Sequence, residues 1–206
     1  DGASERFSQV AKNLTKLGVG MTVVHSYRGW SDLSLIAKQD FITYAISPRY
    51  YYQDHSVAER IIEERKPDVI EMNDLELVMS TGLHLSQRFN IPLVYDTQFV
   101  SSVLLENLNA GPEAIREERN QERALGKVIS GAICFTDLDK RHFQETTGID
   151  QARIVVIPLG SDTASIKSRE LKKNDKTILF LGNMYFEPNS EAVEYAAEQI
   201  IPAVIA

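Results

Sequence analysis

The sequence has few of the residues that build disulfides, zinc sites and membrane spans. Its 206 residues contain a single cysteine, Cys134, which excludes an intramolecular disulfide and a zinc site built from several cysteines. Its apolar runs reach only about five residues, whereas a membrane-spanning helix needs about 20. A lone thiol fits a reducing compartment, so we expect the protein in the cytoplasm.

Positive charge is also scarce. Lys and Arg number 22 against 29 Asp and Glu, which gives a formal charge of −7. An acidic balance argues against a broad nucleic-acid-binding surface, so we expect no nucleic-acid partner. Charged residues make up 25% and hydrophobic residues 43% of the chain, which are ordinary proportions for a globular protein with a buried core.

Several short catalytic motifs are missing as well. The sequence has no G-x-G-x-x-G, no phosphate-binding P-loop and no G-x-S-x-G. Its four histidines do not have the spacing of metal ligands, so no metal site is predicted. These histidines are His25, His55, His84 and His142.

A regular alternation of two patterns runs through the first 160 residues. Short apolar runs rich in β-branched residues alternate with amphipathic stretches such as 4–17 and 54–65. Apolar strands separated by helices are typical of a parallel sheet covered on both faces. We therefore predict a doubly wound, mostly parallel, Rossmann-like α/β domain. The predicted strands are 21–25, 41–46, 69–72, 91–96, 131–135 and 154–157.

The chain changes character after residue 160. Residues 161–176 are polar and predict a linker. Residues 177–206 predict a new strand–helix unit, with a strand at 177–181 and a helix from about 189 to 200. This unit either begins a second domain or packs on the first.

Polar residues follow the predicted strands at the points where the strands end. In an open parallel sheet, ligands bind beyond the carboxyl ends of the strands, so these positions favour a polar ligand. The alternative is ordinary helix capping, because Ser, Thr, Asp and Asn are common N-caps. The segments concerned are 25–28, 71–74, 96–98, 136–137 and 160–162.

Short motifs spread along the chain, taken in their order, form a characteristic set. They include Gly2-Ala3-Ser4-Glu5-Arg6, Pro67-Asp68-Val69, Tyr95-Asp96-Thr97-Gln98, Pro158-Leu159-Gly160-Ser161-Asp162 and Pro188-Asn189. The set resembles retaining GT-B glycosyltransferases of the group 1 (family 4) type. It spans the first domain of such enzymes and the beginning of the second.

The resemblance implies half of a GT-B architecture, whose active site lies in the cleft between two domains. It implies retaining transfer of a sugar from a nucleotide-sugar to a glycan or lipid-linked acceptor, as in polysaccharide biosynthesis, without a cofactor or metal. The first domain binds mainly the acceptor, and the second binds the donor. The resemblance leaves open a peripheral membrane contact and a homodimer.

The resemblance also supplies candidate residues, although it assigns no catalytic residue. The candidate substrate-binding residues are Gly2, Ala3, Asn73, Asp74, Asp96, Gln98, Gly182 and Asn183. The candidate hinge residues are Pro158, Gly160 and Asp162.

The sequence departs from the family pattern in several respects. Gln98 stands where the family has histidine; glutamine can hydrogen-bond a sugar hydroxyl but cannot act as an acid or base. The chain ends before most of the donor domain, and the strand expected before Gly2 is absent. We therefore expect a piece of a longer protein that is inactive alone, with an open strand position that residues 177–181 fill in the same chain or a neighbouring one.

Two other functions stay open. One is a glycan-binding module without catalysis, which the glutamine at position 98 favours. The other is a nucleotide-sugar epimerase of the same architecture. The segments 158–162 and 188–192 favour the transferase over the epimerase.

Overall fold

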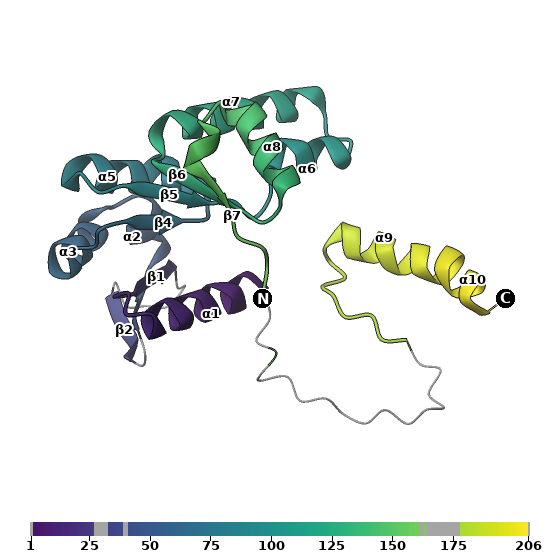
Figure 1. Cartoon of the computed structure of the whole chain (residues 1–206), viewed down its shortest axis with the longest axis horizontal. Helices are drawn as coiled ribbons and strands as arrows, with labels where there is room; N and C mark the ends of the chain where they lie inside the picture. Colours follow the sequence, from purple (N-terminus) through teal and green to yellow (C-terminus); the bar gives the residue numbers. More distant parts are fainter. Residues whose placement is uncertain (1, 27–32, 39–40, 161–162, 164–177, 206) are drawn as a thin grey trace. The chain divides into compact units, whose positions relative to one another are not determined.

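The chain forms two compact units, Asp1–Gly160 and Ser161–Ala206. The computed structural model describes residues 2–26, 33–38, 41–160, 163 and 178–205 (Figure 1). The strands of the first unit are β1 Thr22–Ser26, β2 Leu33–Lys38, β3 Ile42–Ile46, β4 Ile70–Met72, β5 Leu93–Asp96, β6 Gly131–Cys134 and β7 Ile154–Val156. Its helices are α1 Gly2–Lys16, α2 Pro48–Tyr52, α3 Ser56–Arg65, α4 Leu75–Leu77, the π-helix η1 Val78–Gly82, α5 Leu83–Phe89, α6 Ser101–Asn107, α7 Pro112–Val128, α8 Asp137–Thr147 and the 3₁₀-helix η2 Gln151–Arg153.

The strands of the first unit make two sheets. Strands β4, β5, β6 and β7 pair in that order, and every pair is parallel. The second sheet has the order β1-β3-β2, in which β1 and β3 are parallel and β2 is antiparallel to β3. Mixed α/β structure with parallel strands between helices confirms the predicted fold class. The sequence did not predict β2.

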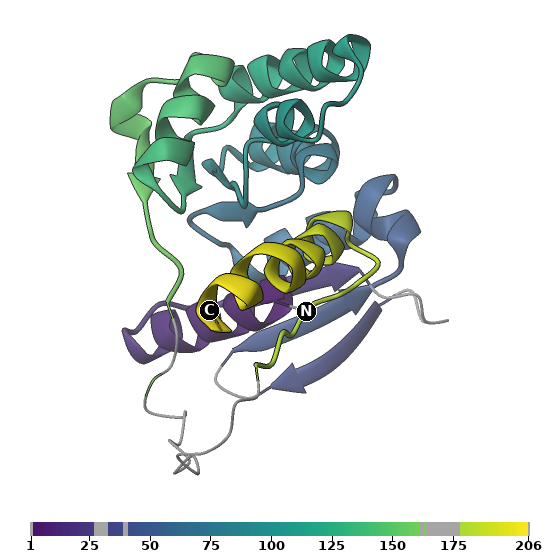
Figure 2. The same cartoon turned by 90° about the vertical axis from the view of Figure 1, so that its right-hand side faces the viewer.

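The division into two sheets leaves β1 and β4 as edge strands. No described residue pairs with the outer side of either strand. Helix α1 lies beside the three-stranded sheet. Helices α6, α7 and α8 lie together beside the four-stranded sheet, on the side away from α1 (Figure 2).

Each sheet has its own apolar core. The larger core lies on one face of β4–β7, where α5, α7 and α8 contribute Leu85, Leu125 and Phe143, all at most 3% exposed. The smaller core joins β3 to α3 through Tyr44, Ile46, Val57 and Ile61. Helices α7 and α8 approach closely at Gly126, where a Cβ atom would lie 2.6 Å from the carbonyl oxygen of Thr147.

Among its described residues, the second unit contains one helical segment. It consists of α9 Glu187–Tyr195, the π-helix η3 Ala196–Ile200 and α10 Ile201–Ile205. The strand predicted at 177–181 is wrong for the residues described, because 178–181 form no strand and their side chains are exposed. A strand needs a neighbour to pair with, and an apolar run alone does not supply one. Residue 177 lies outside the described residues, and filling of the open strand position stays a prediction.

Candidate functional site

The carboxyl ends of β4, β5 and β6 meet at one edge of the four-stranded sheet. Because the strands are parallel and in register, Met72 lies beside Tyr95, and Asp96 lies beside Ile133. The residues that follow the strands therefore gather at this edge. They include the predicted residues Asn73, Asp74 and Gln98.

An ion pair binds helix α1 to this edge. Arg6 from the second turn of α1 contacts the carboxylate of Asp96, the last residue of β5. The side chain of Asp96 is 1% exposed and that of Arg6 is 15% exposed. The guanidinium carbon of Arg6 also lies 4.4 Å from the centre of the Phe135 ring, just past β6. Arg6 thus links α1 to two strand ends.

A second carboxylate faces the same ion pair. Glu71, in the middle of β4, alternates with Ile70 and so lies on the sheet face away from the larger core. Loss of hydration raises the pKa of Glu71, and the charge of Asp96 raises it further, whereas the charge of Arg6 lowers it. Glu71 as a whole residue is nevertheless exposed to solvent. We name Arg6, Glu71 and Asp96 the edge cluster.

The two carboxyl groups of the edge cluster form a hydrogen bond with each other when Glu71 is protonated. With both ionised, Asp96 Oδ1 is buried without a hydrogen-bond partner among the described residues. Protonated Glu71 donates a hydrogen bond to Asp96, which is a further cause of the raised pKa of Glu71. Of the two carboxyl groups, Glu71 is accessible and has acceptor oxygens to offer to the hydroxyl groups of a ligand.

Asp74 caps a helix. Its Oδ1 accepts a hydrogen bond from the backbone N–H of Leu77 at 2.8 Å, so it is the N-cap of α4. This confirms the capping interpretation that the sequence left open. Asn73, directly before it, is half-buried and makes no side-chain hydrogen bond to a described residue. A substrate role for either residue stays a prediction.

Gln98 lies on a short loop held at both ends. The Thr97 amide donates to the Ile133 carbonyl at 2.9 Å, and the Thr97 hydroxyl donates to the Phe99 carbonyl at 2.8 Å. Thr97 and Val100 are 1% and 4% exposed, whereas Phe99 is 50% exposed. Gln98 is half-buried and has no side-chain hydrogen bond within the described part of the chain. The loop therefore presents two adjacent residues between two buried anchors.

Comparison with known protein families identifies the family of this chain. The family model for Glycosyltransferase Family 4 matches residues 1–165, which include the entire first unit. The chain belongs to glycosyltransferase family 4. The match confirms the resemblance seen in the sequence, and the glycosyltransferase family 4 unit is a Rossmann-like half of a GT-B architecture. The comparison with curated proteins gives no significant match.

The remaining predicted residues of this glycosyltransferase family 4 chain occupy separate places. Gly2 and Ala3 lie in the first turn of α1. Pro158 and Gly160 lie in the exposed segment after β7, and Asp162 lies outside the described residues. Asn183, in the second unit, accepts through Oδ1 from the Tyr185 amide at 3.0 Å and closes the turn before α9, beside Gly182.

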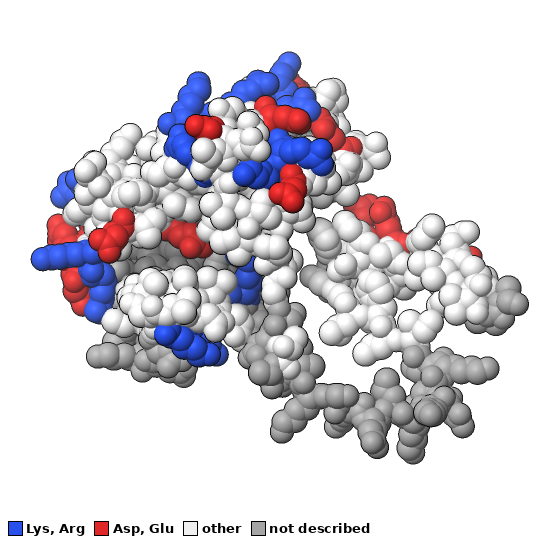
Figure 3. All heavy atoms as spheres, viewed as in Figure 1, with Lys and Arg blue, Asp and Glu red and all other residues white. Residues whose placement is uncertain are grey.

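Two arginines of α7 form ion pairs at the surface. Arg116 pairs with Glu113 at 3.3 Å, and Arg119 pairs with Glu106 of α6. Lysines, arginines and acidic residues lie side by side on this face (Figure 3). In the glycosyltransferase family 4 unit these charges are paired at the surface, where each pair contributes little to stability.

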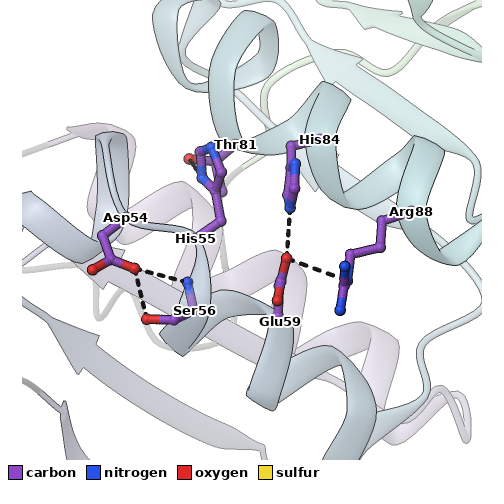
Figure 4. Close-up of polar contacts among 7 residues, drawn as sticks. All are labelled: Asp54, His55, Ser56, Glu59, Thr81, His84 and Arg88. Atoms are coloured by element: carbon purple, nitrogen blue, oxygen red, sulfur yellow. Dashed lines mark hydrogen bonds and ion pairs between the residues drawn. The ribbon is translucent and has the colours of Figure 1, made fainter.

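A second polar cluster connects α3 to α5 (Figure 4). His84 Nε2 lies 2.6 Å and Arg88 Nε 3.3 Å from Glu59 Oε1. The rings of His55 and His84 stack with centres 4.4 Å apart, and His55 Nδ1 lies 3.2 Å from Thr81 Oγ1. Burial, and then the charge of His84, lowers the pKa of His55. We name these five residues the histidine cluster.

The described residues meet the requirements of neither a metal site nor a membrane-spanning helix. Within the described ranges, no group of three or more His, Cys, Asp or Glu side chains is arranged to hold a metal ion. No helix in the same ranges combines the length and apolar character that crossing a bilayer requires.

Two residues of the edge cluster had not been predicted as site residues. The sequence singled out Glu71 only as part of the polar segment 71–74, and Arg6 only as part of the N-terminal motif. Arg6 could not be found by spacing, because its partner lies 90 residues along the chain.

Proposed function

We propose that this chain is the acceptor-binding half of a retaining glycosyltransferase that uses a nucleotide-sugar donor and a glycan or lipid-linked acceptor. The observation that carries the proposal is the family match over the entire first unit. The polar edge formed by β4, β5 and β6 supports it, since ligands of open parallel sheets bind at this edge.

In this proposal each residue at the edge has a part in binding the acceptor. Gln98 donates and accepts hydrogen bonds to neighbouring sugar hydroxyls. The exposed ring of Phe99 provides an apolar surface for a sugar ring. Arg6 neutralises Asp96, and Glu71 offers an acceptor oxygen or, when protonated, a donor. Asn73 and Asp74 border the same edge, and Gly2 and Ala3 begin the helix that Arg6 fixes to it.

Transfer itself requires the donor half. The bond between the sugar's anomeric carbon and the diphosphate breaks, and a bond to the acceptor oxygen forms with the same configuration. A nucleoside diphosphate and the acceptor's proton leave. We assign Gly182 and Asn183 to the donor side, Pro158, Gly160 and Asp162 to the hinge, and no metal or cofactor to the reaction. The chain by itself then binds acceptor without transferring sugar.

The same proposal places the protein in the cytoplasm. Cys134 is fully buried and burial raises the pKa of its thiol to about 12, so it stays an unreactive core residue in a reducing compartment. A peripheral membrane contact would bring the protein to a lipid-linked acceptor, and size measurements on the chain decide between a monomer and a homodimer.

Two measurements test the proposed function. The chain is screened for binding to a glycan panel, and its full-length gene product is assayed for nucleoside diphosphate release from a panel of nucleotide-sugars with the glycans that bind. We expect release that depends on acceptor, and an acceptor KM that rises several-fold, about the value of one hydrogen bond, in Gln98→Ala. Arg116→Ala, on the exposed face of α7, is the matched control and leaves KM unchanged.

The alternatives give different results in the same assays. Tight glycan binding without release from any nucleotide-sugar supports the binding module, for which the glutamine at position 98 is the specific observation. A nucleotide-sugar whose sugar changes configuration while it stays joined to the nucleotide supports the epimerase. No binding and no release would reject the proposed function.

A further inference from the structure

A second buried carboxylate lies behind the Gln98 loop. Glu122 of α7 is 4% exposed, and within the described ranges Asp96 is the other buried carboxylate. Glu122 Oε1 accepts a hydrogen bond from the backbone N–H of Ser102 at 3.1 Å. Glu122 Oε2 and the Ser102 hydroxyl are both buried without a partner among the described residues. Burying a carboxyl group with one oxygen left without a hydrogen-bond partner is costly, which calls for a reason beyond packing.

The contact supplies a helix cap that the local sequence does not provide. The N-cap residue of α6 is Val100, whose side chain cannot accept a hydrogen bond. The first amide groups of a helix need an acceptor, and a negative charge beside them is favourable. Burial raises the pKa of Glu122, whereas the hydrogen bonds from Ser102 and Ser101 lower it. Glu122 therefore caps α6 from the neighbouring helix.

The capped end of α6 is where the Gln98 loop ends. Val100 is buried in the larger core, and Ser102, two residues later, is 1% exposed. On the other side, Thr97 is held by the Ile133 carbonyl of β6. The positions of Gln98 and Phe99 therefore depend on two attachments, one to the sheet and one to Glu122.

We propose that Glu122 is a positioning residue of the acceptor site, which holds Gln98 and Phe99 in place by capping α6. The acceptor part of this inference rests on the proposed function. Glu122 touches no substrate; it acts through the backbone of Ser102. It selects for acceptors whose hydroxyl groups match a fixed loop, so it affects acceptor recognition and leaves donor recognition unchanged.

The first test measures the loop directly and requires no activity. Cys134 is buried, so a spin label attached to Gln98→Cys reports on the loop alone. We expect Glu122→Ala to increase the label's mobility and to speed hydrogen exchange of residues 101–103 by about tenfold, the size expected for one lost cap. Glu122→Gln keeps an acceptor oxygen and should restore most of the order. Glu117→Ala, exposed on the same helix, is the matched control.

The second test uses the full-length gene product. Glu122→Ala should raise the acceptor KM about tenfold, with kcat and the donor KM within about twofold of the parent, as expected when only binding is weakened. Glu122→Gln should recover most of the acceptor KM. If Glu122→Ala fails to fold, the mobility of the spin label is measured in Glu122→Gln instead. It should exceed the mobility in the parent and stay below that of an uncapped loop.

The outcomes separate this inference from the proposed function. Unchanged mobility and exchange in a folded Glu122→Ala chain overturn the inference whether or not the protein transfers sugar. An unchanged acceptor KM in an active Glu122→Ala enzyme also overturns it. An inactive parent rejects the proposed function, and the mobility measurement then decides alone whether Glu122 positions the loop.

Discussion

The edge cluster joins a helix to two strands and the histidine cluster joins two helices, both through ion pairs, but the two clusters differ in burial. Asp96 is 1% exposed and has Arg6 as its cation, whereas Glu59 is 22% exposed and has both His84 and Arg88. Removing one partner of a buried pair leaves a charge without water or a counter-charge. Removing a partner at the surface leaves a charge that water solvates. Burial, more than the number of ion pairs, should therefore decide which cluster holds the first unit together.

The largest expected effect comes from Arg6→Ala. The substitution leaves the Asp96 carboxylate buried and unpaired, so we expect the free energy of unfolding to fall by about 3–5 kcal/mol. Urea denaturation followed by circular dichroism measures it. The double variant Arg6→Met/Asp96→Leu should recover much of the loss, because apolar side chains replace the pair. An Arg6→Ala chain as stable as the parent would show that Asp96 is well solvated. Burial would then not decide how much each cluster contributes to stability.

The next effect concerns pH at the edge cluster. The pKa of Glu71 is raised in the folded chain, so the folded state favours protonated Glu71, and ionisation at neutral pH opposes folding. Glu71→Gln keeps a hydrogen-bond donor for Asp96 without the charge. We expect it to raise the melting temperature at pH 7, by less than Arg6→Ala lowers it.

The pH dependence of that gain has a definite sign. It should grow as pH rises above the ordinary glutamate pKa of 4.5 and level off above the raised pKa of the folded state. It should be small at about pH 4, where Glu71 is mostly protonated in both states. A gain that is equal at pH 4 and pH 7 would mean that charge is not its cause.

The smallest expected effect is Glu59→Gln in the histidine cluster. The pKa of Glu59 is lowered, first by its hydrogen bond with His84, so the ionised form is the favoured one. Because Arg88 and His84 stay solvated after the change, we expect the smallest shift in the urea midpoint of the three variants. About 1 M NaCl should remove the difference from the parent, since salt screens exposed charges but hardly affects buried ones. A loss of stability as large as that of Arg6→Ala, or one that persists in salt, would contradict the expectation that the exposed cluster contributes less than the buried one.

Local sequence predicted most of the elements near the edge. The apolar runs at 69–72, 91–96 and 131–135 correspond to β4, β5 and β6. Thr136 caps α8 by accepting from the Asp139 amide at 3.0 Å, and Asn90 ends α5 in a left-handed conformation. Each of these features is caused by residues only a few positions away, so a short stretch of sequence is enough to predict it.

Other features could not be predicted because their cause is distant. Strand β2 has no clear alternation and forms only because β3 lies beside it. The run at 178–181 has the composition of a strand but no partner, and its side chains Leu179 and Leu181 are 84% and 91% exposed. Strand propensity describes how well a residue fits a sheet, and the sheet must be provided by the rest of the chain.

The amino-acid sequence alone determined that this protein is an α/β glycosyltransferase family 4 chain, because periodicity and collinear motifs are properties of the order of residues. Only the tertiary structure decided which charges are buried and what they face. Arg6 meets Asp96, and Glu122 meets Ser102, across 90 and 20 residues. The energy of an ion pair or a cap depends on distance and on exclusion of water, and both are set when the helices pack on the sheet.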